Sequence, residues 1–263
     1  MVKSYEDLKQ KVLAMSSFFE TSTGYPTTYG VTSGNWDLQG MSFGCLQVNF
    51  GQGTLQPFFN YMNTNYNQLC RDIFGTYYTE WSNLLADTTA NQVAWADARS
   101  VYGNGRDKGI LNATWKPLFQ ALGETQPSID KQIEMSVEWL PNTEKWFEQL
   151  GLWSRKGFAL CWDISVHLGR LMPMNLIWND FKNMVTTGKT REQIEEEKLR
   201  IITNRITYDN RVADTNKQLV FDRKTMLIDG TGSYYGTPFS MAQYDLEYEP
   251  AFEYNELGGL YIG

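Results

Sequence analysis

Two carboxylates stand in a polar stretch of the chain that contains no basic residue. Glu20 and Asp37 are the only acids in residues 18–54, which hold no Lys, Arg or His and are rich in Gly, Ser, Thr, Asn and Gln. Two carboxyl groups can cleave a glycosidic bond, because one donates a proton to the leaving oxygen while the other activates water or attacks the sugar. This pair is therefore the first candidate for chemistry in the chain.

The neighbours of each acid suggest how the two roles divide. Glu20 follows Phe18 and Phe19, and an apolar surround favours the protonated form that a general acid needs. Asp37 lies among glycines and polar residues, where a solvated loop would keep it ionised as a base. Carboxyls about 6.5–9.5 Å apart predict inversion, and about 5–5.5 Å predicts retention. Both acids also have a structural reading, as a surface acid and as an Asx-turn residue.

The elements around this pair are predicted from local patterns. The apolar residues of the segment 5–19 recur at three- and four-residue steps, at Leu8, Val12, Met15 and Phe19. This spacing predicts a helix that ends at Glu20. The following residues are rich in turn formers, and we expect a small β insertion near residues 25–45. Residues 56–74 are expected to be helical.

The remainder of the chain also reads as mainly helical. Residues 155–170 are apolar nearly all round, which predicts a central buried helix carrying Asp163 as a hydrogen-bonded acid. Residues 190–206 begin with a capping-box pattern at Thr190, and their charges predict a solvated face. The tail from Leu227 onward is expected to be irregular or weakly stranded.

Two separated motifs resemble one known family. Downstream of Glu20 the chain has Asp37 followed by a pattern of small residues at Gly40, Ser42, Gly44, Gly51 and Gly53-Thr54. This order resembles the N-terminal catalytic region of family 46 glycoside hydrolases, the chitosanases of the lysozyme-like superfamily. Residues 161–169 (CWDISVHLG) look like the family's Tyr-Tyr-Asp-x-x-Val-x-His-Gly helix. The resemblance covers roughly residues 10–60 and 130–170.

The resemblance implies a fold and a mechanism. It implies a mainly α, lysozyme-like α+β fold, with residues 1–263 as one catalytic domain whose two helical lobes and β-hairpin region line a central cleft. Glu20 would be the general acid and Asp37 the base for water. Ser42, at the family's Thr position, would orient that water. An inverting glycosidase is expected, without metal or cofactor.

Departures from the family pattern bear on the substrate. Leu38 and Gln39 replace the Gly and Arg of the family's Asp-Gly-Arg-Gly segment, and acids that would hold cationic glucosamine are not evident in residues 27–35. Amide side chains suit N-acetyl groups, because both are neutral donors and acceptors. We therefore expect an N-acetylated amino-sugar polymer, peptidoglycan rather than chitosan. The residues expected to line its binding cleft are Tyr25, Trp36, Gln39, Gln47 and Asn49.

Composition narrows the partners further. The net charge of −7 argues against nucleic acid, and no apolar run reaches the length of a membrane span. The N-terminus carries acids where the apolar core of a secretory signal peptide would lie, so we expect a protein made in the cytoplasm without classical export. Together with the resemblance, this implies an endolysin, a virion-associated lysin or a non-classically exported effector that acts on the bacterial cell wall. His167 is the only histidine and is expected to be a satisfied core residue. Buried free thiols are expected at Cys45, Cys70 and Cys161.

Other functions remain open at this stage. A chitosanase proper would act on deacetylated polymer. A lytic transglycosylase would need only Glu20, as acid and then base. A virion or sugar-binding protein could keep the fold without turnover.

Overall fold

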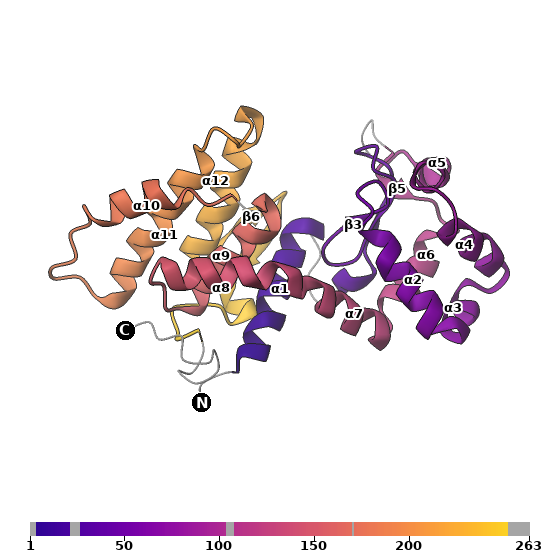
Figure 1. Ribbon diagram of the computed structural model, residues 1–263, viewed down its shortest axis with the longest axis horizontal. Coiled ribbons are helices and arrows are strands. Elements are labelled where there is room, and N and C mark those ends of the chain that lie inside the picture. The colour runs from indigo at the N-terminus through magenta and orange to yellow at the C-terminus, as the bar shows by residue number, and fades with distance from the viewer. Residues whose placement is uncertain (1–3, 22–26, 104–107, 170, 252–263) are drawn as a thin grey trace. The chain divides into compact units, whose positions relative to one another are not determined.

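The computed structural model describes residues 4–21, 27–103, 108–169 and 171–251 (Figure 1). The chain divides into two compact units, which are described separately. Unit 2 is one continuous segment, residues 20–136, whereas unit 1 is built from the residues on either side of it. The fold is mainly helical with small antiparallel hairpins, as the sequence predicts. Within the described residues no helix is both long and apolar enough to cross a membrane.

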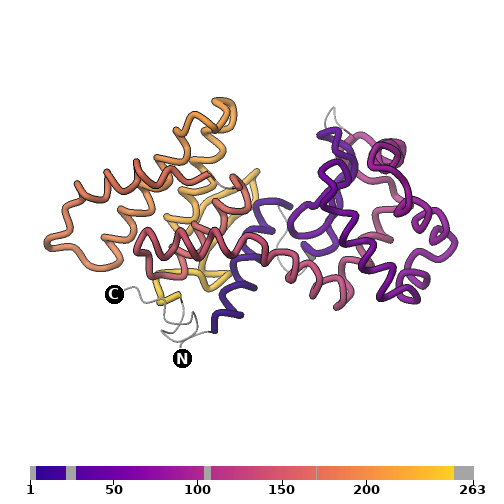
Figure 2. The backbone as a smooth tube through the Cα atoms, viewed as in Figure 1, coloured from indigo at the N-terminus to yellow at the C-terminus, as the bar shows by residue number. Residues whose placement is uncertain are grey.

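Unit 1 is a helical assembly with a β-hairpin after its last α-helix. Its elements are α1 (Tyr5–Thr21, as far as Phe19), η3 (Val137–Trp139), α8 (Leu140–Gln149), α9 (Arg155–Leu168), α10 (Met174–Phe181), α11 (Arg191–Thr207), α12 (Asp214–Asp229), β6 (Thr231–Tyr234), β7 (Thr237–Ser240) and η4 (Met241–Tyr244). Helix α9 is buried over most of its length and packs against α8, α11 and α12. Figure 2 follows the backbone through α10, α11 and α12, which pack in sequence order.

Helix α1 forms where the apolar stripe predicts it. Leu8, Val12 and Met15 are fully buried, and the Trp162 indole donates a hydrogen bond to Ser16 Oγ (2.8 Å). At the end of this helix the Phe19 ring packs against rings of the β6–β7 hairpin, Tyr234 at 5.1 Å and Phe239 at 4.9 Å between centroids. The apolar face of α1 is thus buried within unit 1 up to the residue before Glu20.

Unit 2 combines short strands with short helices. Its elements are η1 (Thr27–Gly30), β1 (Thr32–Ser33), β2 (Ser42–Phe43), β3 (Val48–Asn49), α2 (Leu55–Asn65), α3 (Asn67–Phe74), η2 (Gly75–Tyr77), α4 (Tyr78–Leu85), α5 (Thr89–Arg99), β4 (Ser100–Val101), β5 (Ile110–Leu111), α6 (Lys116–Gly123) and α7 (Gln126–Ser136). The first three strands form one antiparallel sheet, β1-β2-β3. Its core is an apolar cluster rich in Phe and Trp.

Several element boundaries differ from the sequence-based predictions. The helix expected over 56–74 is interrupted at Tyr66, whose backbone leaves the helical region. The β insertion reaches Asn49 rather than ending near residue 45. The irregular tail begins later than Leu227, because α12 continues to Asp229 and is closed by Gly230 in the left-handed region (φ 79°). The weakly stranded part of that tail is the β6–β7 hairpin.

Candidate functional site

The loop that carries Asp37 is held firmly within unit 2. Asn35 is its anchor: its backbone N–H donates to Ser100 Oγ (2.9 Å), its amide donates to Asp97 Oδ1 (2.9 Å), and its Oδ1 accepts from the Gly40 N–H (2.7 Å). Gly34 donates to the Gly109 carbonyl (3.0 Å), and a Cβ at position 34 would overlap neighbouring backbone. Three elements distant in sequence therefore fix this loop.

Asp37 itself shapes the tip of the loop. Its Oδ1 accepts a hydrogen bond from the Gln39 N–H (3.1 Å), which is the Asx-turn pattern. Its Oδ2 makes no hydrogen bond with the described residues. The side chains on either side are open to solvent, Trp36 at 58% exposure and Leu38 at 76%. The residue therefore builds the turn with one oxygen and keeps the other available.

Ser42 and Gln39 lie at the base of the same loop. Ser42 begins β2, is buried, and pairs with Ser33 on one side and Asn49 on the other. The Gln39 carbonyl accepts from the Gly51 N–H (2.8 Å). The Gln39 side chain lies so close to Gly51 that a Cβ there would overlap its amide oxygen. The small residue at 51 thus serves packing in the loop.

Two amides expected to bind substrate make contacts inside the turn. The Gln47 amide donates to the Gly44 carbonyl (2.8 Å), and Gln47 itself has a left-handed backbone (φ 48°). Asn49 is 4% exposed, and its Oδ1 accepts from the Gln52 N–H (2.9 Å). Each side chain therefore has a structural task that the sequence did not reveal, and its role in binding stays a prediction.

Glu20 occupies the last turn of α1. It is half-buried, its Oε1 is shielded from solvent, and it directly follows the packed Phe19 ring. The next residue, Thr21, has its hydroxyl 3.3 Å from the hydroxyl of Thr28 in η1, which leads into β1. Tyr25 lies outside the described residues. The end of α1 thus contacts η1, the element that precedes the small sheet.

A second group of ionisable residues is buried in unit 1. Asp163 on α9 receives hydrogen bonds from Arg223 (2.7 Å from Nη2) and from Lys224, and all three side chains are essentially inaccessible. Burial alone would raise the pKa of Asp163, but attraction to Arg223 and Lys224 outweighs it and holds the pKa well below its usual range. The prediction of a buried, hydrogen-bonded acid is confirmed.

His167 completes this cluster as a neutral imidazole. Its Nδ1 lies 3.3 Å from Lys224 Nζ, and an ammonium group can only donate, so Nδ1 is the acceptor and the ring proton belongs on Nε2. Burial, and then the cations Lys224 and Arg223, lower the pKa of His167 to about 3. The sequence did not predict these two cations, although adjacent basic residues in a helical stretch were the available signal.

In the parts of the chain that the structure describes, the residues that commonly bind metal ions do not form a metal site. No group of three or more His, Cys, Asp or Glu there could hold a metal ion. The three cysteines are free and buried, as predicted. Burial raises the pKa of Cys70 to about 11 and raises those of Cys45 and Cys161 further.

Comparison of the chain with models of protein families, with curated proteins and with solved structures gives no match. The case for a function therefore rests on the residues themselves. What they offer is a half-buried carboxyl at a helix end and a second carboxyl on an anchored loop that keeps one oxygen available.

Proposed function

We propose that this chain is a glycoside hydrolase that cuts the glycan strand of peptidoglycan, with Glu20 as general acid and Asp37 as base. The observation that carries the proposal is the Asp37 loop, because Asn35 fixes its backbone while Asp37 Oδ2 makes no hydrogen bond with the described residues. A catalytic group must be held in a fixed position, and its reacting atom must remain accessible to the substrate.

The proposed reaction uses both acids in one displacement. Glu20 donates its proton to the leaving glycosidic oxygen, and Asp37 Oδ2 takes a proton from the water that attacks the anomeric carbon. Glu20 is assigned the acid role because it is half-buried with its Oε1 shielded from solvent, whereas Asp37 lies on a loop whose neighbouring side chains are exposed. Ser42 is assigned the orientation of the water, and the expected stereochemical outcome is inversion.

The substrate assignment follows from the surface near Asp37. The exposed indole of Trp36 offers a flat apolar face for a sugar ring, and the neighbouring loop residues are neutral. Neutral groups suit an N-acetylated polymer better than cationic glucosamine. The proposed setting is a bacterial cell wall attacked by an endolysin or virion-associated lysin.

The test is digestion of purified peptidoglycan by the wild type, Glu20→Gln and Asp37→Asn. Glu20→Gln should lose about 10²–10⁴-fold in activity, the usual contribution of general acid catalysis, and Asp37→Asn should lose a similar factor. Matched controls are Glu6→Gln on the same helix and Asp130→Asn in unit 2, both exposed acids that should keep full activity. Equal clearing by wild type and Glu20→Gln would remove Glu20 from the mechanism.

Analysis of the products separates the remaining possibilities. Reducing ends support hydrolysis, whereas anhydro-muropeptides together with an active Asp37→Asn variant would establish a transglycosylase. Turnover of chitosan without turnover of peptidoglycan would establish a chitosanase. A wild type that binds the polymer but releases no product would be a sugar-binding protein.

A further inference from the structure

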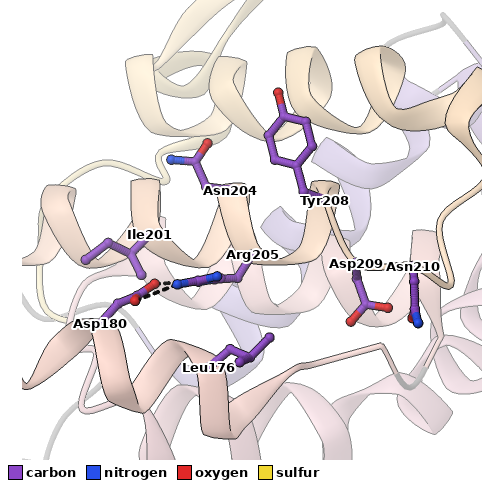
Figure 3. Close-up of a pocket in the computed structure, with 8 residues that line it drawn as sticks. All are labelled: Leu176, Asp180, Ile201, Asn204, Arg205, Tyr208, Asp209 and Asn210. Atoms are coloured by element: carbon purple, nitrogen blue, oxygen red, sulfur yellow. Dashed lines mark hydrogen bonds and ion pairs between the residues drawn. The ribbon is translucent and has the colours of Figure 1, made fainter.

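A groove of about 480 Å³ lies in unit 1, between α10, α11 and the turn that follows α11 (Figure 3). Its lining includes the Asp180–Arg205 pair, Asn204, Tyr208 and Asn210, with an apolar contribution from Leu176 and Ile201. None of these residues belongs to the site around Glu20 and Asp37. The groove therefore needs an explanation of its own.

The carboxylates along the groove are paired with arginines. Arg205 binds Asp180 through two hydrogen bonds, Nε to Oδ2 (2.5 Å) and Nη2 to Oδ1 (2.7 Å), and Figure 3 shows the pair between facing helices. The hydrogen bond from Arg205 lowers the pKa of Asp180. Asp209 is held in the same two-bond manner by Arg211. With its charges balanced, the groove suits a neutral ligand better than an ion.

The uncharged groups of the groove are available to a ligand. Tyr208 is 67% exposed, and Asn204 lies one helical turn before it, so the two project from the same side of α11 in Figure 3. The side chains of Asn204 and Asn210 are exposed and make no hydrogen bond with the described residues. They differ in this from Gln47 and Asn49, whose amides already bond within their turn.

This combination matches what a sugar offers. A pyranose ring has an apolar C–H face that can lie on an aromatic ring, and its hydroxyl and acetamido groups need neutral donors and acceptors. We propose that the groove between α10 and α11 is a second carbohydrate-binding site, for N-acetylated amino-sugar units, that holds polymer without cutting it. The identity of the polymer rests on the proposed function, whereas the site is defined by its own residues.

The experiment measures binding apart from turnover. In a Glu20→Gln background, binding of a chitin tetrasaccharide is followed by calorimetry, and binding to insoluble peptidoglycan by co-sedimentation. Tyr208→Ala should weaken both by about three- to tenfold, as expected for loss of one aromatic contact. Tyr208→Phe should bind like its parent. The matched control is Tyr235→Ala, which removes a 75% exposed tyrosine from the β6–β7 turn outside the groove.

The outcomes separate this proposal from the proposed function. Equal binding by Tyr208→Ala, Tyr235→Ala and the parent would reject the proposed binding site. A parent that binds neither ligand would also reject it. A circular dichroism melt confirms that Tyr208→Ala is folded, and Asn204→Ala provides a second variant on the same face. If Tyr208→Ala but not Tyr235→Ala loses binding and the wild type does not cleave peptidoglycan, the binding site in the groove is supported and the proposed hydrolase activity is rejected.

Discussion

The cores of the two units differ in whether buried charges accompany the apolar side chains. The core of unit 2 is a run of packed rings, such as Phe59 on Phe119 with centroids 5.3 Å apart and Phe74 on Trp81 at 4.4 Å. The centre of unit 1 instead carries Asp163 between two buried cations. Burial of rings depends little on pH, whereas a buried ion pair requires one protonation state on each partner. Acid should therefore weaken unit 1 before unit 2.

The difference also concerns what one substitution can do. A buried ion pair adds little stability in itself, because desolvation offsets most of the attraction. Removing one partner is costly, since the other charges stay buried without compensation. An apolar core loses stability in proportion to the volume removed.

The largest effect is expected from Asp163→Ala. It would leave Arg223 and Lys224 buried without their acid, and should destabilise unit 1 by about 3–5 kcal/mol. Hydrogen exchange resolved by peptide should show α9 and α12 losing protection while unit 2 keeps it. Asp222→Asn, an exposed acid next to Arg223 in sequence, is the control and should change little. Uniform loss of protection over both units would contradict this separation.

Phe119→Ala should destabilise the aromatic core of unit 2. Phe119 is fully buried against several rings, and its truncation should cost about 3 kcal/mol or more. The loss should be confined to unit 2 and should be the same at pH 7 and pH 5. A cost that changes with pH over this range would show that the aromatic core is coupled to a titrating group.

Lowering the pH should destabilise unit 1, because His167 is neutral in its folded state. The folded chain keeps this ring neutral down to about pH 3, whereas the unfolded chain protonates it near pH 6.5. Between these values the unfolded state binds the extra proton, so the stability of unit 1 falls as the pH falls, by up to about 1.4 kcal/mol per pH unit.

The variant His167→Gln keeps an acceptor for Lys224 and should flatten this dependence in urea titrations from pH 7 to pH 5. Identical slopes for the two proteins would exclude His167 as the source. At lower pH the depressed pKa of Asp163 adds a further loss, because its contribution disappears as the pH falls through the folded value.

The smallest effect is expected at the start of α11. Thr190 and Gln193 form a reciprocal capping box, and Thr190→Ala should cost about 1 kcal/mol. Thr215→Ala, an exposed threonine in the first turn of α12 that does not cap its helix, is the control. Equal melting temperatures for Thr190→Ala and Thr215→Ala would show that the capping box contributes no measurable stability.

Features determined by near neighbours could be predicted from the sequence. The stripe of α1 and the Thr190 capping box are set by residues three or four positions apart, and both are present in the structure. The burial of Asp163 was also predicted, because an acid on an all-round apolar helix must lie inside.

Contacts between distant segments could not be predicted in this way. The partners of Asp163 lie 60 and 61 positions away, where basic residues look like ordinary surface charges of a helix. The anchor of the Asp37 loop depends on Ser100 and Asp97, which no local pattern connects to Asn35. The α10–α11 groove could not be predicted for a related reason, since the charges of residues 190–206 have the pattern of a solvated face.

The insertion of unit 2 within the sequence of unit 1 has a consequence for synthesis on the ribosome. Helix α1 emerges before its partners on α9, such as Trp162, which follow only after the whole of unit 2 has been translated. At about 5–20 residues per second this delay is on the order of ten seconds. During that time the segment 20–136 can fold around its aromatic core. The apolar face of α1 remains exposed to solvent and accessible to chaperones.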